Sequence, residues 1–423
     1  MRRWLNRTGF LLVLIISVVS TVLAEGDLSF RAGLGYEFIS QEYFLDSLAL
    51  SGADTLATIT SLKTTYLDDV TGRLSATYRP SAGSTLEFEG TLEQTPDVFR
   101  ARFNSEYRPV WGKVKVDWTG ELDWREGVSD AVAAGESYLL GYGKARFMLP
   151  ITEISSLWWQ AHTEFIQFDS AGDYSYDHNR LGGKLGLSWS MTDFSSLVLN
   201  SFLMTRNVPD SSELDYANYG AEVSYFGFMD GGTLDLYGRL EKRDYRLPGD
   251  QDDYFGLELN GRHKVNVGDR LFLQQDLDVE AFSFDQDDFI NRNYIRAKLV
   301  LQAGLQGTEL SAAIGPHMEL LSEAQDEFIT GEDYFEAGIR GNLDFFKPSL
   351  FGLLESTLGH RNIYGEAELQ SDFVFHRLNC VFDWRFWGAV SFNSMLSAEW
   401  EWHENAEENS QLFLVSSWLT CRF

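Results

Sequence analysis

Acidic and basic side chains occupy every second position in several pairs of successive segments, which is the spacing of one face of a β-strand. On neighbouring strands such rows can form cross-strand ion pairs, and across water they produce a transverse field that orients charged solutes. The residues are Glu87 and Glu89 with Arg100 and Arg102; Asp117 and Glu121 with Lys144 and Arg146; and Asp276, Asp278 and Glu280 with Arg292, Arg296 and Lys298. Reinforcement of a wall is the simpler interpretation, and a field acting on solutes is the alternative.

Catalysis would need a nucleophile beside a base. The seven histidines (162, 178, 263, 317, 360, 376 and 403) are scattered, and no two have the spacing of a helical metal motif. His360 and His376 fall on neighbouring predicted strands with Ser356 close by, which is a residue combination that covalent hydrolases use. Because no local sequence marks a nucleophile, we predict that the protein is not an enzyme and needs no cofactor.

Two acidic strings, GDQDDYF (249–255) and FDQDDFI (284–290), resemble each other and begin 35 residues apart. Clustered carboxylates are the hard oxygen ligands that calcium prefers, so Asp250, Asp252, Asp285 and Asp287 are weak calcium candidates. Neither string has the twelve-residue pattern of a calcium loop. Solvated loop tips are therefore the preferred interpretation, and we predict no metal site.

Apolar and polar residues alternate strictly over 8 to 12 residues throughout the chain, which is typical of strands with one apolar face. In LQQDLDVEA, for example, Leu273 and Leu277 alternate with Asp276 and Asp278. About twenty strands are predicted, near residues 28–38, 66–79, 85–94, 98–108, 113–125, 137–149, 156–168, 178–190, 196–206, 214–226, 232–243, 254–265, 270–284, 290–303, 308–318, 334–345, 350–360, 373–385, 389–401 and 410–423.

The predicted connections are of two kinds. Some, such as NVGD and KPS, are short, whereas most of the others, such as SEAQDEFITGED, are longer and acidic. Seven of the eight prolines lie at strand boundaries, and the exception, Pro316, predicts a bulge or an early strand exit. Short turns at one end and longer loops at the other favour an all-β fold, a transmembrane antiparallel β-barrel of about 20 strands (range 16–22). A soluble β-sandwich or β-solenoid is the alternative.

The strand assignment has two local consequences. Cys380 and Cys421 fall on strands separated by one other strand, about 9.6 Å apart. That separation exceeds the roughly 7 Å limit between the Cα atoms of a disulfide, so two free thiols are predicted. Tryptophans near strand ends predict interfacial girdles, and a lumenal sugar-binding row of Trp158, Trp384 and Trp418 is the alternative.

The chain begins with Arg2, Arg3 and Arg7, followed by an apolar run and a small-residue end at Ala24. This layout predicts a secretory signal peptide over residues 1–24, because the apolar run is shorter than the roughly 20 residues that a membrane-spanning helix needs. Residues 25–423 are predicted to form one barrel domain.

The chain ends in LFLVSSWLTCRF, in which Phe413, Val415, Leu419 and the terminal Phe423 share one face. This ending resembles the assembly signal of bacterial outer-membrane β-barrel proteins, and the rest of the chain is porin-like in general pattern. The resemblance implies a multi-pass barrel in the outer membrane, with short periplasmic turns and acidic extracellular loops. It also implies the barrel-assembly machinery, outer-membrane lipid and lipopolysaccharide as partners.

A sheet in hydrocarbon must close, because every backbone polar group has to be paired. Barrels of this size enclose an aqueous lumen, and we expect the charged rows to line it as a pore. The longest predicted connection, residues 39–65, is a candidate for an inward constriction. An outward hairpin extension is the preferred interpretation.

The net charge is −29, from 34 Lys+Arg and 63 Asp+Glu, which excludes a sequence-independent nucleic-acid binder. The ten predicted outer connections contain 33 of the acidic residues and only three basic ones, which predicts a negative mouth. The leading hypothesis is a porin-type channel for small hydrophilic solutes or ions. The alternatives are a conduit for a partner system, in polysaccharide export or extracellular electron transfer, and a structural or adhesive surface barrel. The oligomeric state is left open.

Overall fold

The computed structural model describes residues 27–51, 55–80, 85–95, 97–127, 137–169, 176–209, 211–229, 231–247, 252–285, 293–323, 333–364, 371–404 and 409–422. Within these ranges, the side chains of residues 27, 39–51 and 55–69 are not described. The predicted signal peptide, Arg292, Asp250, Asp287 and Phe423 lie outside the described residues.

The described chain consists almost entirely of strands, with one short 3₁₀ helix, η1 (Ser212–Leu214). The strands are β1 (Asp27–Ser51), β2 (Thr55–Arg79), β3 (Leu86–Gln94), β4 (Val98–Tyr107), β5 (Val110–Trp111), β6 (Val114–Gly127), β7 (Tyr138–Pro150), β8 (Ser155–Phe168), β9 (His178–Thr192), β10 (Ser195–Asn207), β11 (Tyr216–Met229), β12 (Gly232–Tyr245), β13 (Tyr254–Val267), β14 (Leu271–Phe284), β15 (Tyr294–Gln306), β16 (Leu310–Glu323), β17 (Asp333–Lys347), β18 (Leu350–Tyr364), β19 (Phe373–Trp387), β20 (Val390–His403) and β21 (Ser410–Arg422).

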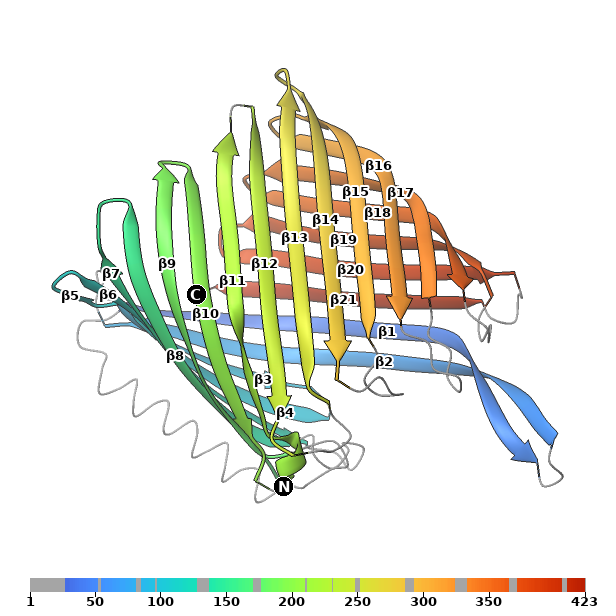
Figure 1. Cartoon of the computed structure of the whole chain (residues 1–423), viewed down its shortest axis with the longest axis horizontal. Coiled ribbons are helices and arrows are strands. Elements are labelled where there is room, and N and C mark those ends of the chain that lie inside the picture. Colours follow the sequence, from blue (N-terminus) through green and yellow to red (C-terminus); the bar gives the residue numbers. More distant parts are fainter. Residues whose placement is uncertain are drawn as a thin grey trace.

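Each long strand pairs antiparallel with its neighbours in the sequence, and the sheet closes because β1 also pairs with β21 (Figure 1). The two-residue β5 pairs with β6 inside a turn, so the wall itself has 20 strands. The predicted all-β antiparallel barrel of about 20 strands is therefore confirmed. Its architecture is that of a bacterial outer-membrane, multi-pass β-barrel.

The outer face of the barrel is an apolar belt. Leu181 and Leu185 on β9 and Leu203 on β10 each expose more than half of their surface, while Arg180 and Lys184 occupy the alternate positions on the inner face. Such a large apolar surface is stable against lipid and would be unstable against water. No helix among the described residues has the length and hydropathy needed to cross a membrane.

Aromatic rings lie flat across glycines of the neighbouring strand and fix the register there. A Cβ atom added to Gly186 would come within 2.3 Å of the Trp158 ring, and one added to Gly35 within 2.7 Å of the Trp418 ring. Because a one-residue slip would place a side chain under each ring, these contacts oppose slippage of the strands.

The two ends of the barrel are built differently. At the short-turn end, Gly112, Gly231 and Gly268 adopt positive φ angles of 63°, 84° and 74°, a conformation that favours glycine. At the opposite end, a side chain near the start of one strand accepts a hydrogen bond from a backbone N–H at the end of the preceding strand. These acceptor and donor pairs, at 2.5–2.9 Å, are Ser137 with Gly127, Asp177 with Phe168, Asp215 with Val208, Asp253 with Tyr245, Asn293 with Phe284, Asp333 with Glu323, Asp372 with Ile363 and Asn409 with His403.

The assignment of residues 39–65 to a connection is wrong for the part of this segment that the structure describes. Residues 39–51 and 55–65 continue β1 and β2, paired in unbroken register from Ile39 opposite Leu67 to Ser51 opposite Thr55. Figure 1 shows this hairpin running past the rest of the wall. The structure therefore supports the outward extension and not the inward constriction. The segment is rich in Thr and apolar strand-forming residues, which favours its pairing as strands.

Ten charged residues assigned to outer connections lie within strands instead, among them Glu319 in β16, Arg361 in β18 and Glu401 in β20. Glu319 and Arg361 form ion pairs on the inner wall, and Glu401 lies 3.7 Å from His403, contacts that local sequence does not reveal. Pro316 also lies inside β16, without the expected early exit. The β15–β16 register is the same on both sides of Pro316, but the pairing between the two strands is interrupted at Leu301 and Gln302.

Candidate functional site

The register places the described charged residues that we predict to line a pore on the inner face. They alternate with exposed apolar residues of the outer belt, such as Leu122 and Leu277. The inner-face residues are Glu87, Glu89, Arg100, Arg102, Asp117, Glu121, Lys144, Arg146, Asp276, Asp278, Glu280, Arg296 and Lys298. Their action on solutes stays a prediction.

Several of these side chains form ion pairs on a different side from the one that the sequence pattern suggests. Arg100 is bound to Asp123 of β6, with Nε–O distances of 2.9 and 3.1 Å, and not to the acidic row of β3. Lys298 lies opposite Asp278 of β14 in the register, but its ion pair is with Glu319 of β16, at 3.6 Å. Alternation shows which face a side chain occupies, but not toward which neighbouring strand it leans.

Glu319 is the centre of one buried group on the inner wall. Its side chain is only 3% exposed and accepts hydrogen bonds from Arg296 Nε at 2.9 Å and from the Tyr334 hydroxyl at 2.7 Å. Lys298 adds a second positive charge. The carboxylate is thus held in place from β15 and β17.

Glu336 on β17 is the centre of a second buried group. Its carboxylate is completely enclosed and accepts hydrogen bonds from His317 at 2.8 Å, Arg361 at 2.7 Å and Arg377 at 2.9 Å. Arg377 also forms an ion pair with Glu399 on β20, at 2.5 Å. The two groups are linked by Tyr334, whose hydroxyl binds Glu319 and whose ring lies 3.9 Å from the Arg361 guanidinium, so side-chain contacts extend along the described wall from β15 to β20.

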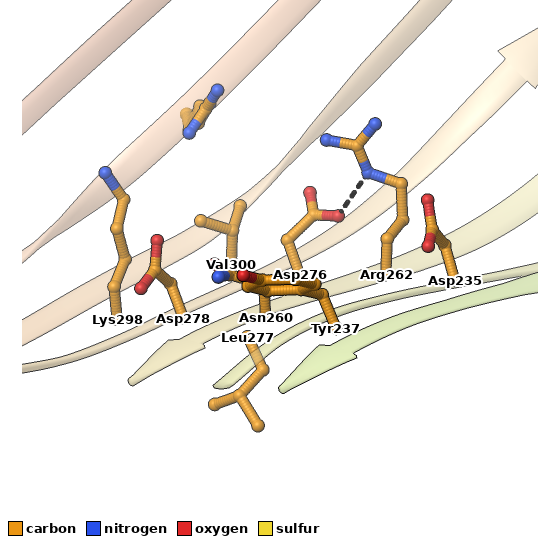
Figure 2. Close-up of a pocket in the computed structure, with 11 residues that line it drawn as sticks. Asp235, Tyr237, Asn260, Arg262, Asp276, Leu277, Asp278, Lys298 and Val300 are labelled. Carbon is orange, nitrogen blue, oxygen red and sulfur yellow. Dashed lines mark hydrogen bonds and ion pairs between the residues drawn. The ribbon is translucent and has the colours of Figure 1, made fainter. Parts of the chain in front are cut away.

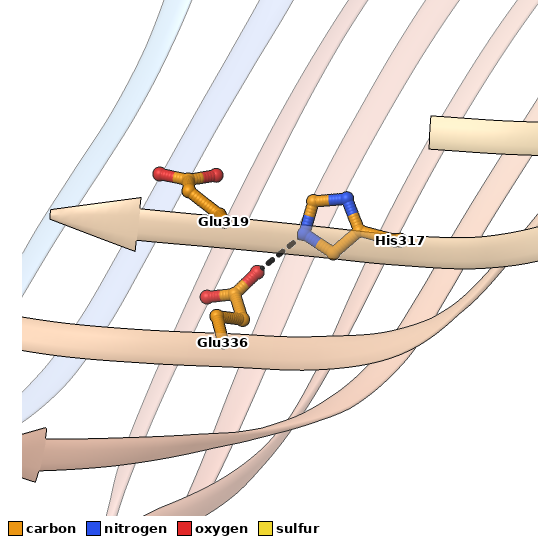
Figure 3. Close-up of side chains that lie close together, drawn as sticks. All are labelled: His317, Glu319 and Glu336. Carbon is orange, nitrogen blue, oxygen red and sulfur yellow. Dashed lines mark hydrogen bonds and ion pairs between the residues drawn. The ribbon is translucent and has the colours of Figure 1, made fainter. Parts of the chain in front are cut away.

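His317, Glu319 and Glu336 bring their donor atoms within 4.8 Å of one another, a spacing that suits a metal ion (Figure 3). However, both carboxylates already bind guanidinium groups, and Lys298 lies beside Glu319. A divalent cation would have to displace these partners or share the site with their positive charges. We therefore interpret the group as part of the wall network.

A hollow of about 420 Å³ lies on the inner wall over β12–β17 (Figure 2). In Figure 2 the Asp276 carboxylate and Arg262 are joined by an ion pair of 2.8 Å, whereas Leu277 points to the opposite side of the sheet. The polar lining residues are Asp235, Tyr237, Asn260, Arg262, Asp276, Asp278, Lys298 and Arg340.

The charges of this hollow are only partly compensated by one another. Arg262 is paired with Asp276, and Arg340 with Glu355 outside the hollow. Asp235 and Asp278 have no ion-pair partner among the described residues. The sequence pattern identified Asp276, Asp278 and Lys298 but missed Asp235, Tyr237 and Arg340. Alternation along β12 and β17 marks the inner face, but it does not show which positions meet across several strands.

The three tryptophans proposed as a sugar-binding row do not share one face of the barrel. Trp158 and Trp418 lie on the inner face and Trp384 on the outer face, and Trp158 is covered by the Arg146 guanidinium at 4.2 Å. The row of three lumenal tryptophans is therefore wrong. Cys380 and Cys421 are free, on β19 and β21.

Three further sets of candidates can be located on the barrel, and their roles stay predictions. Ser356 Oγ and His376 Nε2 lie 2.9 Å apart on the outer face, and the lack of enzymatic activity stays a prediction. Asp252 and Asp285 lie beside the β13 and β14 strand ends, and calcium binding there is untested. Phe413, Val415 and Leu419 share the outer face of β21.

No protein-family model matches the chain, and no curated protein sequence matches it. Solved structures do. The ferric citrate transporter FecA in its unliganded form is 8% identical with a TM-score of 0.55, over 94% of this chain and 79% of that one. The copper transporter OprC is 11% identical with a TM-score of 0.53, over 94% and 81%. The outer-membrane protein opdK from Pseudomonas aeruginosa is 14% identical with a TM-score of 0.46, over 94% and 98%. At these identities the similarity to FecA and OprC, whose TM-scores exceed 0.5, shows a common barrel fold and nothing further.

Proposed function

We propose that this protein is an outer-membrane channel of porin type, through which small hydrophilic solutes or ions pass passively. The inner wall carries the proposal. It is lined by charged side chains and contains a polar hollow, whereas the outer face is apolar. Barrels of 16 to 18 strands already enclose an aqueous channel, and this wall has 20.

A negative extracellular mouth is part of the same proposal. With the strand bounds of the structure, the ten connections at the loop end contain 25 acidic and only two basic residues, Arg246 and Arg292. Such a rim would concentrate cations and repel anions within a Debye length, about 8 Å at physiological ionic strength.

Planar-bilayer recording of the refolded protein under a tenfold KCl gradient tests the proposal. We expect a stable conductance with a cation-selective reversal potential that decreases as the total salt rises. The variant E404Q/E407Q/E408Q, at the loop end, should be less cation-selective. The matched control D193N/D269N/E309Q removes three exposed acids from the turn end and should change selectivity less. Absence of conductance from correctly folded protein would contradict the channel, and anion selectivity of the wild type would contradict the negative mouth.

Attachment at the cell surface is a second candidate function, favoured by the β1–β2 extension. The pairing of β1 with β21 ends at Glu42, and that of β2 with β3 ends at Gly72, so beyond these residues the described hairpin has two unpaired edges. Unpaired strand edges are templates for binding another chain. Deleting residues 43–63 should then reduce attachment of whole cells to surfaces without changing single-channel conductance, and unchanged attachment would contradict this role.

A further inference from the structure

Arg206 on β10 and Arg243 on β12 differ from most arginines of the inner wall. Arg100, Arg180, Arg239, Arg296, Arg361 and Arg377 each have a carboxylate within ion-pair distance. Neither Arg206 nor Arg243 has one among the described residues, and the Nε atoms of both are enclosed without a hydrogen-bond partner. Among the described residues, these two arginines therefore lack the carboxylate partner that most arginines of the inner wall have, as does Arg146 over Trp158.

Both guanidinium groups lie against the same aromatic ring. The Cζ atom of Arg243 is 4.4 Å from the centre of the Tyr216 ring and 4.8 Å from that of Tyr254, and the Cζ atom of Arg206 is 6.0 Å from the Tyr216 centre. The two Cζ atoms are thus within about 10 Å of each other, close enough for one small solute to bridge. Tyr216 itself is only 4% exposed.

The position on the wall suits a passing solute. Arg206 lies opposite Tyr216 in the register and one residue from the end of β10, and Arg243 lies two residues from the end of β12. Both therefore occupy the inner face just inside the loop-end rim. Arg180, on the adjacent β9, acts electrostatically on Arg206 as well, although it has its own partner in Glu164.

A guanidinium is planar and presents its N–H groups as a fork that fits the oxygens of a carboxylate or a phosphate. An aromatic surface can hold such a group in place through cation–π contact without using its N–H edge. Here two guanidinium groups lie against one ring, and neither has a carboxylate partner among the described residues. Binding of an oxyanion between them would relieve the repulsion between their positive charges.

We propose that Arg206 and Arg243, held over Tyr216, form a binding site for an oxyanion group, a carboxylate or a phosphate, on a small solute that enters the lumen. The site deepens the proposed channel function and rests on it for its biological use. The binding itself does not require conduction, so the two can fail separately.

Calorimetric titration of the refolded barrel in detergent, at about 0.15 M KCl, measures binding directly. The probes are succinate and inorganic phosphate, with neutral succinamide as the uncharged analogue. We expect saturable binding of at least one anion and none of succinamide, and the stronger of the two anions identifies the class of oxyanion. The variant R206Q/R243Q should weaken this binding at least tenfold.

The matched control is R79Q/R108Q, which removes two exposed arginines from the turn end of the lumen and leaves the same net charge as R206Q/R243Q. It should retain wild-type affinity. Equal loss in both double variants would assign the effect to overall charge and overturn the site, as would no anion binding by the wild type. Anion binding by a barrel that does not conduct would contradict the channel but support the site.

Discussion

The Arg361 guanidinium on β18 lies 2.7 Å from the Glu336 carboxylate on β17, and the Glu336 side chain has no exposed surface. Arg377 from β19 and His317 from β16 bind the same carboxylate. One acidic residue thus binds side chains from three other strands, two of them arginines. Removing it would leave Arg361 without its counter-charge, while Arg377 would keep only Glu399.

The first prediction concerns this carboxylate. Glu336→Gln keeps the shape of the side chain but removes its charge, and breaking a buried ion pair costs about 3–5 kcal/mol. Because pore water can hydrate the arginines, we expect a loss near 2–3 kcal/mol in the free energy of unfolding, measured by urea denaturation in lipid vesicles. The control Glu106→Gln breaks an exposed pair with Arg108 and should cost less than about 1 kcal/mol. Equal losses in the two variants would contradict the central role of Glu336.

The second prediction concerns the ring and glycine contacts. Gly186→Val places side-chain atoms where the Trp158 ring now lies, so the ring must turn away from the wall. We expect a loss of about 1–3 kcal/mol in stability and a red shift of tryptophan emission as the indole meets lumen water. Gly72→Ala is the control, because a Cβ there meets no atom within 4 Å. An unshifted spectrum would show that the ring does not depend on this glycine.

The sequence predicted the strands and their faces because alternation is a local property. On β14, for example, the positions of Asp276 and Leu277 suffice to assign the two sides. Contacts between strands were not predictable in the same way. The ion pair of Lys298 with Glu319 depends on which way a flexible side chain leans, and Glu319 itself was assigned to a loop because an acidic run follows it.

The same limit explains the hollow on the inner wall. Asp235, Asn260 and Lys298 come from three strands, and they meet only after the register of each hairpin is set. No short sequence motif shows that these three residues are neighbours in space. The outward extension of β1 and β2 was the preferred interpretation, but its continuous strand pairing was not predicted, because its composition is typical of both a strand and an apolar loop.

The third prediction concerns the hydrogen bonds at the loop end. Asp372 Oδ1 accepts from the Ile363 N–H at 2.8 Å, and Asn293 does the same for Phe284 at 2.6 Å without a negative charge. Asp372→Ala should therefore cost about 1 kcal/mol and speed hydrogen exchange of the Ile363 amide, whereas Asp372→Asn should restore both. Loss of protection in the Asn variant as well would show that charge, and not the acceptor geometry, closes the hairpin.

The last prediction concerns the rows of alternating charges on β14 and β15. Arg296 and Lys298 are both bound to Glu319 and face the lumen from β15, beside the acidic row of β14. In R296Q/K298Q the Glu319 carboxylate and that acidic row lose their positive neighbours, so the lumen should become more cation-selective. The measurement is the reversal potential in planar bilayers under a KCl gradient, where the wild type and R79Q/R108Q serve as references. A shift larger than that of R79Q/R108Q would show that these charges of the inner wall act on permeating ions. An unchanged reversal potential would mean that these pairs only reinforce the wall.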